Sequence, residues 1–185
     1  WIGGWASFAT GASEVVEVQV GLSLIGTGQA RRNLEAEIGK RGFDQVRQAA
    51  RDAWNCRLGR IEVEGGTASD RTVFATALYH TLMAPADYTE EGGRFWTAAD
   101  MRGAVTEWAD RRFYTDDWCA WDTFRTSRPL ATLVEPETVD DVVASYLHLY
   151  RQGGWLPKCT WHASGYSRVM IGNHAVAIIA DAVTK

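Results

Sequence analysis

Residues 138–154 read TVDDVVASYLHLYRQGG, and this stretch decides what kind of fold the chain adopts. Apolar side chains recur in it every three or four residues: Val139, Val142, Val143, Tyr146, Leu149 and Tyr150. That spacing places them along one side of a helix. Gly153 and Gly154 end the pattern, because glycine readily adopts the left-handed backbone that terminates helices. The stretch predicts a long amphipathic helix with one buried face.

Outward from this helix, the same periodicity predicts further helices on both sides. The expected helices span residues 29–38, 43–58, 70–83, 120–134 and 173–182. Ser69 or Asp70 is the expected N-terminal cap of the third, and Pro85 closes it. Strands and helices do not alternate along the chain, which argues against a doubly wound parallel sheet.

A strand pattern precedes the helices. Residues 14–24 read EVVEVQVGLSL, with alternate apolar side chains at Val16, Val18, Val20 and Leu22. Strict alternation is typical of a half-buried strand. Two long connections, 86–118 and 155–170, separate the later helices, and connections of that length are often functional. The expected fold class is mainly α: an arc of a helical toroid, preceded by the last strand of a β domain.

Length and composition suit a folded protein with a core. A chain of 20.5 kDa should expose roughly 8,900 Å² when folded, against about 30,000 Å² when unfolded. Hydrophobic residues make up 46% and charged residues 23%, which excludes a disordered protein. A net charge of −4 offers no basic field for nucleic acid. The apolar stretch 171–180 is too short to span a bilayer, so no membrane span is expected.

Tryptophan and cysteine leave alternatives open. Nine tryptophans are present, and they fit either an aromatic core or flat faces for sugar rings. Cys56, Cys119 and Cys159 are widely spaced, with no CxxC pair. Neither a disulfide framework nor a zinc site follows from them, and three buried thiols are expected.

Four blocks carry a family resemblance. They are GGTASDRTVFATALYHTLMAP at 65–85, YTDDWCAWDTFRTSRPL at 114–130, YRQGGWLP at 150–157 and RVMIGNHAVAIIADA at 168–182. In this order and spacing they resemble the catalytic domain of glycoside hydrolase family 92. Upstream, residues 20–38 and 54–66 resemble the family's junction between an N-terminal β-sandwich and its helical domain. The resemblance extends over nearly the whole chain.

The resemblance implies a calcium-dependent, inverting exo-α-mannosidase that removes terminal α-linked mannose from glycans, in a secreted or periplasmic setting. It also implies an (α/α)6 barrel, with the sugar pocket between barrel and β-sandwich. Residues 1–28 are then expected to end the β-sandwich, 29–64 to form linker helices and a short strand, and 65–185 to form the N-terminal part of a truncated catalytic domain. Since family members are much longer, the chain is expected to be a central fragment.

The block WDTFR at residues 121–125 is the first candidate for sugar contact. The resemblance assigns Asp122 to holding the terminal mannose, with Trp121 packed on the sugar ring. From the residues alone, Asp122 would instead cap a helix and Trp121 would pack in the core. Arg125 lies one helical turn after Asp122, so an ion pair that orients the carboxylate is expected.

Two further substrate-binding candidates lie in the later blocks. Trp155 in GGWLP either lines the site or packs as a loop aromatic. His174 in GNHA stands at a helix start and either reaches a pocket or satisfies a turn. Tyr79 and His80 lie on a helix with an apolar face, so both are expected to be buried and hydrogen-bonded.

Neighbouring acids occur at 116–117 and 90–91, without EF-hand spacing, and are expected to be solvated loop charges. An inverting hydrolase needs an acid and a base about 6.5–9.5 Å apart. In the family these carboxylates, and much of the calcium shell, come from segments beyond residue 185. No catalytic or metal residue is therefore assigned, and the chain alone is expected to be inactive.

Other functions remain open. A non-catalytic carbohydrate-binding or structural helical module would also explain the tryptophan content. Another (α/α)6 enzyme, such as a trehalase-like hydrolase, is a third class, against which the WDTFR, GGWLP and GNHA blocks argue. Cys119 and Ala120 before WDTFR, and residues 159–161 after LPK, depart from the family pattern.

Overall fold

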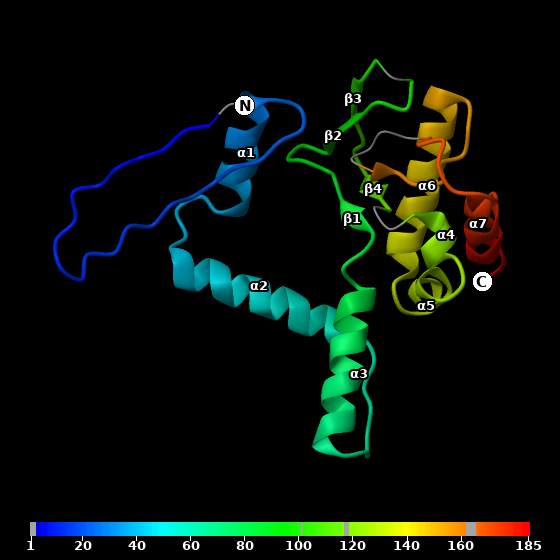
Figure 1. The fold of residues 1–185 in the computed structure, drawn as a ribbon, viewed down its shortest axis with the longest axis horizontal. Helices are drawn as coiled ribbons and strands as arrows, with labels where there is room; N and C mark the ends of the chain where they lie inside the picture. Colours follow the sequence, from blue (N-terminus) through cyan, green and yellow to red (C-terminus); the bar gives the residue numbers. More distant parts are fainter. Residues whose placement is uncertain (1–2, 101, 117–118, 162–165) are drawn as a thin grey trace.

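The computed structural model describes residues 3–100, 102–116, 119–161 and 166–185. Within these ranges the chain is mainly helical, with two small two-stranded sheets (Figure 1). The helices are α1 (Thr27–Glu37), α2 (Phe43–Leu58), α3 (Ala68–Thr81), α4 (Ala120–Thr123), α5 (Ser127–Val134), α6 (Pro136–Gly153) and α7 (His174–Thr184). The expected mainly helical class is confirmed.

Helix α6 is the centre of the best-packed region. It lies against α5, α7 and β4 (Tyr114–Thr115), and the four helices α4 to α7 gather together in Figure 1. Val142 and Tyr146 of α6 are almost fully buried against Ala175 and Ile178 of α7. The expected buried stripe is thus correct in its central part. Gly154 ends the helix with φ of 80°, a conformation that favours glycine.

A β-hairpin packs against the C-terminal half of α6, around Leu149. Strands β2 (Arg94–Thr97) and β3 (Ala104–Glu107) pair antiparallel, and β1 (Ala86–Asp87) pairs with β4. Phe95 stacks on Phe113 with ring centroids 4.4 Å apart, and both pack against Leu149 of α6. The long connection expected at 86–118 therefore contains its own small core.

The helix expected over 120–134 is broken in two. A continuous helix would place the ring of Pro129 against the carbonyl of Arg125 and leave that carbonyl without its partner. Instead α4 ends at Thr123, Thr126 leaves the helical region with φ of −132°, and α5 starts at Ser127. Pro129 then lies in the first turn of α5, where a missing N–H costs little.

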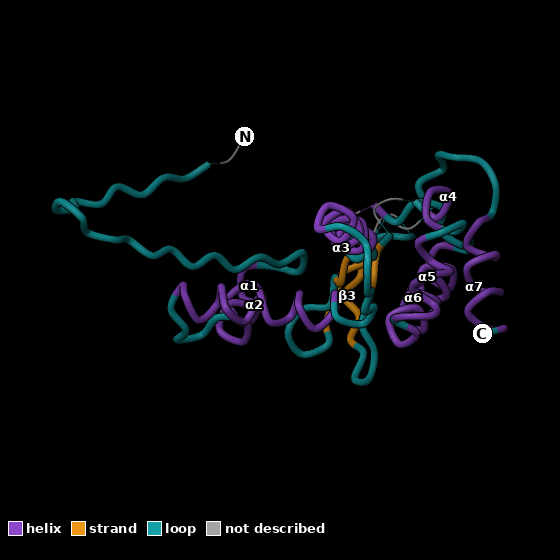
Figure 2. The backbone as a smooth tube through the Cα atoms, turned by 90° about the horizontal axis from the view of Figure 1, so that it is seen from below, coloured by secondary structure: helices purple, strands orange, loops and turns teal. Residues whose placement is uncertain are grey.

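Helices α2 and α3 form an arm that projects from the α4–α7 region, as Figures 1 and 2 show. Trp54 of α2 meets Tyr79 of α3 with ring centroids 4.6 Å apart. At the end of α2, Arg57 donates two hydrogen bonds, at 2.8 and 2.5 Å, to the buried carboxylate of Glu135. The hydrogen bonding to Glu135 raises the pKa of Arg57. The arm is therefore held at its base by a charged contact.

Several expectations for the arm are wrong. The cap of α3 is Thr67, whose hydroxyl accepts from the Asp70 amide at 3.2 Å, while Asp70 reciprocates as in a capping box. Tyr79 and His80 are exposed rather than buried, and Val73 on the expected inner face is 66% exposed. Leu78 and Leu82 near the end of α3 are buried, but no described element covers the helix around Val73, which explains the difference.

The strand expected at 14–24 is also absent from the described structure. Residues 14–24 run as an extended loop in Figure 1, and Val18, Val20 and Leu22 are exposed. A strand needs a neighbour for its backbone hydrogen bonds, and no described segment lies beside this one as a strand. The alternating apolar side chains of residues 14–24 therefore form a surface that no described segment covers.

The arm of α2 and α3 and the extended loop at 14–24 give the chain a large solvent-accessible surface. The chain exposes 12573 Å², well above the roughly 8,900 Å² expected for a compact protein of its mass. None of the described tryptophans is fully buried, but Trp96 and Trp108 are half-buried against the Phe95–Phe113 cluster, so the aromatic core that composition allowed is present in part. Among the described helices, none is both long and apolar enough to cross a membrane.

Candidate functional site

The predicted block WDTFR lies at the start of the α4–α5 segment, with Trp121, Asp122 and Arg125 exposed and Thr123 buried. Trp121 is 38% exposed, and Asp122 beside it is exposed as well. The guanidinium of Arg125 lies 5.9 Å from the Trp121 ring centroid and 5.0 Å from that of Phe124. The expected Asp122–Arg125 ion pair is wrong, because α4 ends before Arg125 and the guanidinium covers the two rings instead.

His174 joins this block from a distant part of the chain. It is the first residue of α7, and its ring lies 4.2 Å from that of Phe124. Gly172 makes room for it: a Cβ there would lie 2.4 Å from the imidazole, and the backbone φ is 76°. We call the surface formed by Trp121, Asp122, Phe124, Arg125 and His174 the Trp121 face. Sequence reasoning missed Phe124, although it stands inside WDTFR.

Trp155, the fifth predicted residue, lies in a neighbouring hollow of about 410 Å³. Its ring is 66% exposed and lies 5.8 Å from that of Tyr166. Lys158 also lines the hollow, with its Nζ 5.4 Å from the Tyr166 ring. Asn173, which precedes His174 in the chain, borders the hollow. The structure therefore links Trp121, Arg125 and His174 through Phe124. Asp122 is exposed next to Trp121 in the chain, and Trp155 lies in an adjoining hollow.

A buried ion pair lies beneath the Trp121 face. The Arg128 guanidinium is 2.8 Å from the Asp116 carboxylate, which also accepts hydrogen bonds from Thr123 at 2.8 Å and Tyr146 at 3.3 Å. Burial and the negative charge of Asp116 raise the pKa of the Tyr146 hydroxyl, so it remains a donor. Asp116 was expected to be a solvated loop charge, and that expectation is wrong. Asp117 lies outside the described residues.

In the second acidic pair, Glu90 is not the solvated charge that was expected. Glu90 is half-buried and accepts hydrogen bonds from Ser23 at 2.5 Å, the Leu24 amide at 2.9 Å and Asn33 at 3.0 Å. Its neighbour Glu91 is exposed, as expected. Glu90 therefore fastens the extended segment and α1 to the start of the β-hairpin.

Cys119 and Cys159 form a disulfide, and Cys56 is an exposed thiol. The expectation of three buried thiols is wrong. Cys119 and Cys159 lie 40 positions apart, and a spacing of that length does not predict a disulfide. The two residues meet because the chain returns to the start of α4 after α6. Nearby, the Asp116 amide donates to Thr160 Oγ1 at 2.5 Å, so two bonds join the same two segments.

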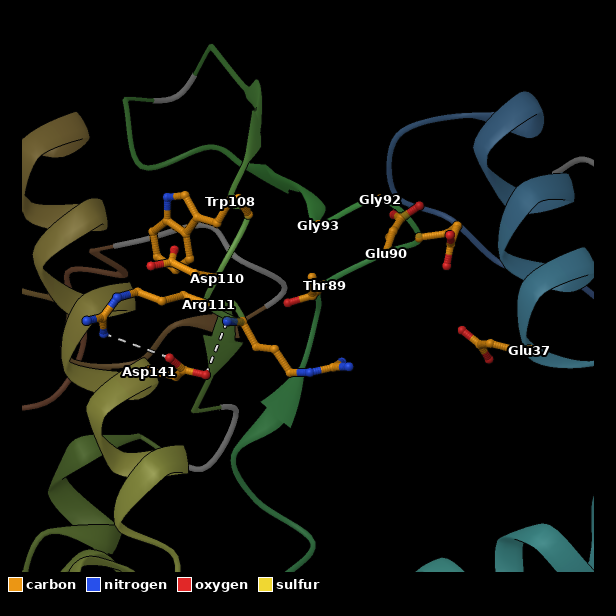
Figure 3. A pocket seen from close by; sticks show the side chains of 12 residues that line it. Glu37, Thr89, Glu90, Gly92, Gly93, Trp108, Asp110, Arg111 and Asp141 are labelled. Carbon is orange, nitrogen blue, oxygen red and sulfur yellow. Dashed lines mark hydrogen bonds and ion pairs between the residues drawn. The ribbon is translucent and has the colours of Figure 1, made fainter.

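A second, larger hollow of about 720 Å³ opens between the β-hairpin, α6 and α1 (Figure 3). Trp108, Asp110 and Arg111 line it, and Arg111 pairs with Asp141 at 3.9 Å. Burial raises the pKa of Asp141. None of the five predicted site residues is among its lining residues, so it is separate from the Trp121 face.

The Trp121 face has the chemistry of a sugar contact. An exposed indole packs on the apolar face of a pyranose ring, and an adjacent carboxylate accepts hydrogen bonds from ring hydroxyls. An imidazole at the opposite edge adds a donor or an acceptor. Among the described residues, no group of three or more His, Cys, Asp or Glu side chains is arranged to hold a metal ion.

Comparison with known proteins identifies the family. The glycosyl hydrolase family 92 catalytic domain matches residues 29–185. The chain belongs to glycoside hydrolase family 92. Among its relatives is a protein described as an uncharacterized secreted glycosidase from Arthroderma benhamiae. It is 30% identical over an alignment of 178 residues, and the match covers 92% of this chain and 18% of that protein.

Solved structures of family 92 agree. An inverting mannosidase of the family from Bacteroides thetaiotaomicron superposes with a TM-score of 0.77 and 34% identity, over 88% of this chain and 21% of that one. A family 92 α-mannosidase from the same organism gives 0.76 and 27%, over 85% and 21%. This family 92 chain thus spans about a fifth of the length of these relatives.

Proposed function

We propose that this chain is part of the catalytic domain of an inverting exo-α-mannosidase that removes terminal α-linked mannose from glycans. The observation that carries the proposal is the exposed pair Trp121 and Asp122 on α4, with His174 brought to the same face through Phe124. Two family 92 relatives described as mannosidases add support, and one α-mannosidase of the family is described in complex with mannoimidazole.

In this proposal the Trp121 face holds the terminal sugar. Trp121 covers an apolar ring face, and Asp122 accepts hydrogen bonds from two neighbouring hydroxyls. Arg125, whose guanidinium lies over the rings of Trp121 and Phe124, keeps the indole in place. Trp155 in the adjoining hollow contacts the next part of the glycan.

The reacting carboxylates come from elsewhere in the enzyme. Inversion needs an acid on one side of the glycosidic bond and a base that activates water on the other, about 6.5–9.5 Å apart. We assign neither role to this chain. Residues 1–28 would then end a β-sandwich, 29–64 would link the domains, and 65–185 would form part of an (α/α)6 toroid.

In this proposal the enzyme shares the family's calcium dependence, with most of the calcium ligands supplied by residues outside this chain. Calcium takes six to eight oxygen ligands, several of them carboxylates, and the described acids do not gather in a group of that kind. Asp116, the most buried acid near the Trp121 face, is already paired with Arg128.

We also place the enzyme outside the cytoplasm. Disulfides such as Cys119–Cys159 form and persist in oxidising compartments. The relative described as a secreted glycosidase points in the same direction. Secretion would bring the enzyme to mannose-containing glycans.

The test is the substitution Asp122→Asn in the complete enzyme. Losing a charged partner for a sugar hydroxyl should lower kcat/KM on an α-mannoside about tenfold to a hundredfold, equivalent to roughly 1.5–3 kcal/mol. The matched control is Asp140→Asn, which changes an exposed carboxylate on α6 and should leave kcat/KM unchanged. Wild-type kinetics in Asp122→Asn would refute the assignment, and mannose binding without hydrolysis by the complete protein would favour the non-catalytic module.

A further inference from the structure

The helix that carries Trp121 and Asp122 cannot hold its own shape. It has four residues, far fewer than an isolated helix needs for stability in water. Its N-cap, Cys119, makes no side-chain capping bond and has φ of 65°, a left-handed conformation that is unfavourable for any residue with a Cβ. Contacts from outside the helix must therefore fix its direction.

Thr123 donates to Asp116 and Ala120 packs against α6 and α7, but the strongest of the outside contacts come from residues 158–159. The disulfide joins Cys119 to Cys159, and the Ala120 amide donates to the Lys158 carbonyl at 2.8 Å. Both cysteines are almost fully buried, at 2% and 0% exposure. The link is thus placed directly before the first residue of α4.

The partner segment is in turn tied to the opposite edge of the Trp121 face. The Nζ of Lys158 donates to the carbonyl of Met170 at 2.9 Å. Met170 lies four residues before His174, the residue whose ring meets Phe124. A path of one covalent bond and one hydrogen bond therefore runs from α4 to the loop that delivers His174.

We propose that Cys119 and Cys159 are positioning residues of the sugar site: their disulfide holds Trp121 and Asp122 at a fixed distance from His174. The inference rests on the proposed function, because it assigns the disulfide a role in sugar binding. Without the bond, α4 keeps the hydrogen bonds from Ala120 to Lys158 and from Thr123 to Asp116, together with the packing of Ala120. It loses its only covalent anchor outside the main chain among the described residues, and its single turn loosens. Sugar affinity then falls while the rest of the fold remains.

The experiment compares the complete enzyme with its Cys119→Ala/Cys159→Ala variant, using alanine because a buried serine hydroxyl would need a partner. Cys56→Ser, which removes the exposed thiol on α2, is the control. KM for an α-mannoside is expected to rise about tenfold or more in the double variant, with kcat changed much less, because binding geometry is lost. The control keeps the KM of the wild type.

Amide hydrogen exchange tests the same idea without substrate. Protection should fall at residues 120–124 and at 170–174 in the double variant, and stay unchanged in α6. A variant that is less heat-stable but keeps the wild-type KM and the wild-type protection of both segments would overturn the proposal. If the wild type neither binds nor hydrolyses mannosides, the proposed function fails, and the exchange experiment still decides whether the disulfide orders α4.

A second variant covers the case in which the alanine pair does not fold. Cys119→Ala/Cys159→Val replaces more of the buried sulfur volume while still removing the bond. Raised KM and loss of protection at 120–124 in this variant support the proposal, and wild-type values of both refute it.

Discussion

The guanidinium of Arg128 lies 2.8 Å from the carboxylate of Asp116, and both side chains are almost wholly withdrawn from solvent. Asp116 precedes α4, Arg128 lies in α5, and Thr123 at the end of α4 donates to the same carboxylate. The pair therefore closes the turn between the two short helices. Removing either charge would leave the other buried without compensation.

We expect Asp116→Asn to lower the free energy of unfolding by about 3–5 kcal/mol, because it leaves the Arg128 charge unpaired. Urea denaturation measures the change. Asp122→Asn, the same substitution at an exposed position, should stay within about 0.5 kcal/mol of the wild type. The apolar pair Asp116→Leu/Arg128→Met should recover part of the loss, and a loss below about 1 kcal/mol in Asp116→Asn would contradict a paired charge.

The disulfide predicts a simple pattern of alkylation. Native protein should take up one iodoacetamide, at exposed Cys56, and all three cysteines should react only after unfolding and reduction. Intact mass spectrometry counts the adducts, and Cys56→Ser should show none in the native state. Closing a loop of 40 residues should also contribute about 4 kcal/mol to stability. Three adducts after unfolding without reductant would show that the bond is absent.

His148 predicts how stability varies with pH. Its ring lies 5.3 Å from that of Phe95 and 5.5 Å from that of Trp108, and burial, together with the charge of Arg151, lowers its pKa. The unfolded chain then binds the proton more readily, so the stability gained from neutral His148 is present above about pH 6.5 and is lost as the pH falls below it. The melting temperature of His148→Phe should fall less between pH 7.5 and pH 5 than that of the wild type; parallel curves would exclude this contribution.

The 185-residue chain by itself should release no mannose, with or without calcium. A positioned acid and a positioned base are each typically worth about 10²–10⁴ in rate, and Trp121 and Asp122 replace neither. The assay is the appearance of free mannose from an α-linked mannobiose. Turnover that rises with protein concentration and disappears in Asp122→Asn would show that the reacting groups lie in this chain.

The sequence was most informative where local pattern and packing agree. The periodicity of 138–154 predicted α6, and its central apolar residues are buried because α7 lies on the same face. At α3 an equally regular pattern predicted a buried face, and the structure buries Leu78 and Leu82 but leaves Val73 exposed. Periodicity indicates which side of a helix is apolar and not whether another element covers it. The break at Thr126 was missed, although Pro129 marks it.

The candidate site was also predictable only in part. The family blocks pointed to Trp121, Asp122, Arg125 and His174. The structure links Trp121, Arg125 and His174 through Phe124 and leaves Asp122 exposed, and the role of these residues in sugar binding stays a prediction. Asp116 and the cysteines were misjudged, because their roles depend on partners 12 and 40 positions away in the sequence. A neighbouring pair of acids has the same appearance in a sequence whether it is solvated or buried.

The large accessible surface also has a consequence for how this chain responds to temperature. An exposed area of 12573 Å² leaves about a fifth less surface to be uncovered on unfolding than in a compact protein of equal mass. Because the heat capacity change of unfolding follows the apolar area uncovered, it should be smaller than the usual value of about 12–15 cal/mol/K per residue. The stability curve is then broad and shallow, and the chain gains little on cooling from 37 °C towards the temperature of maximum stability.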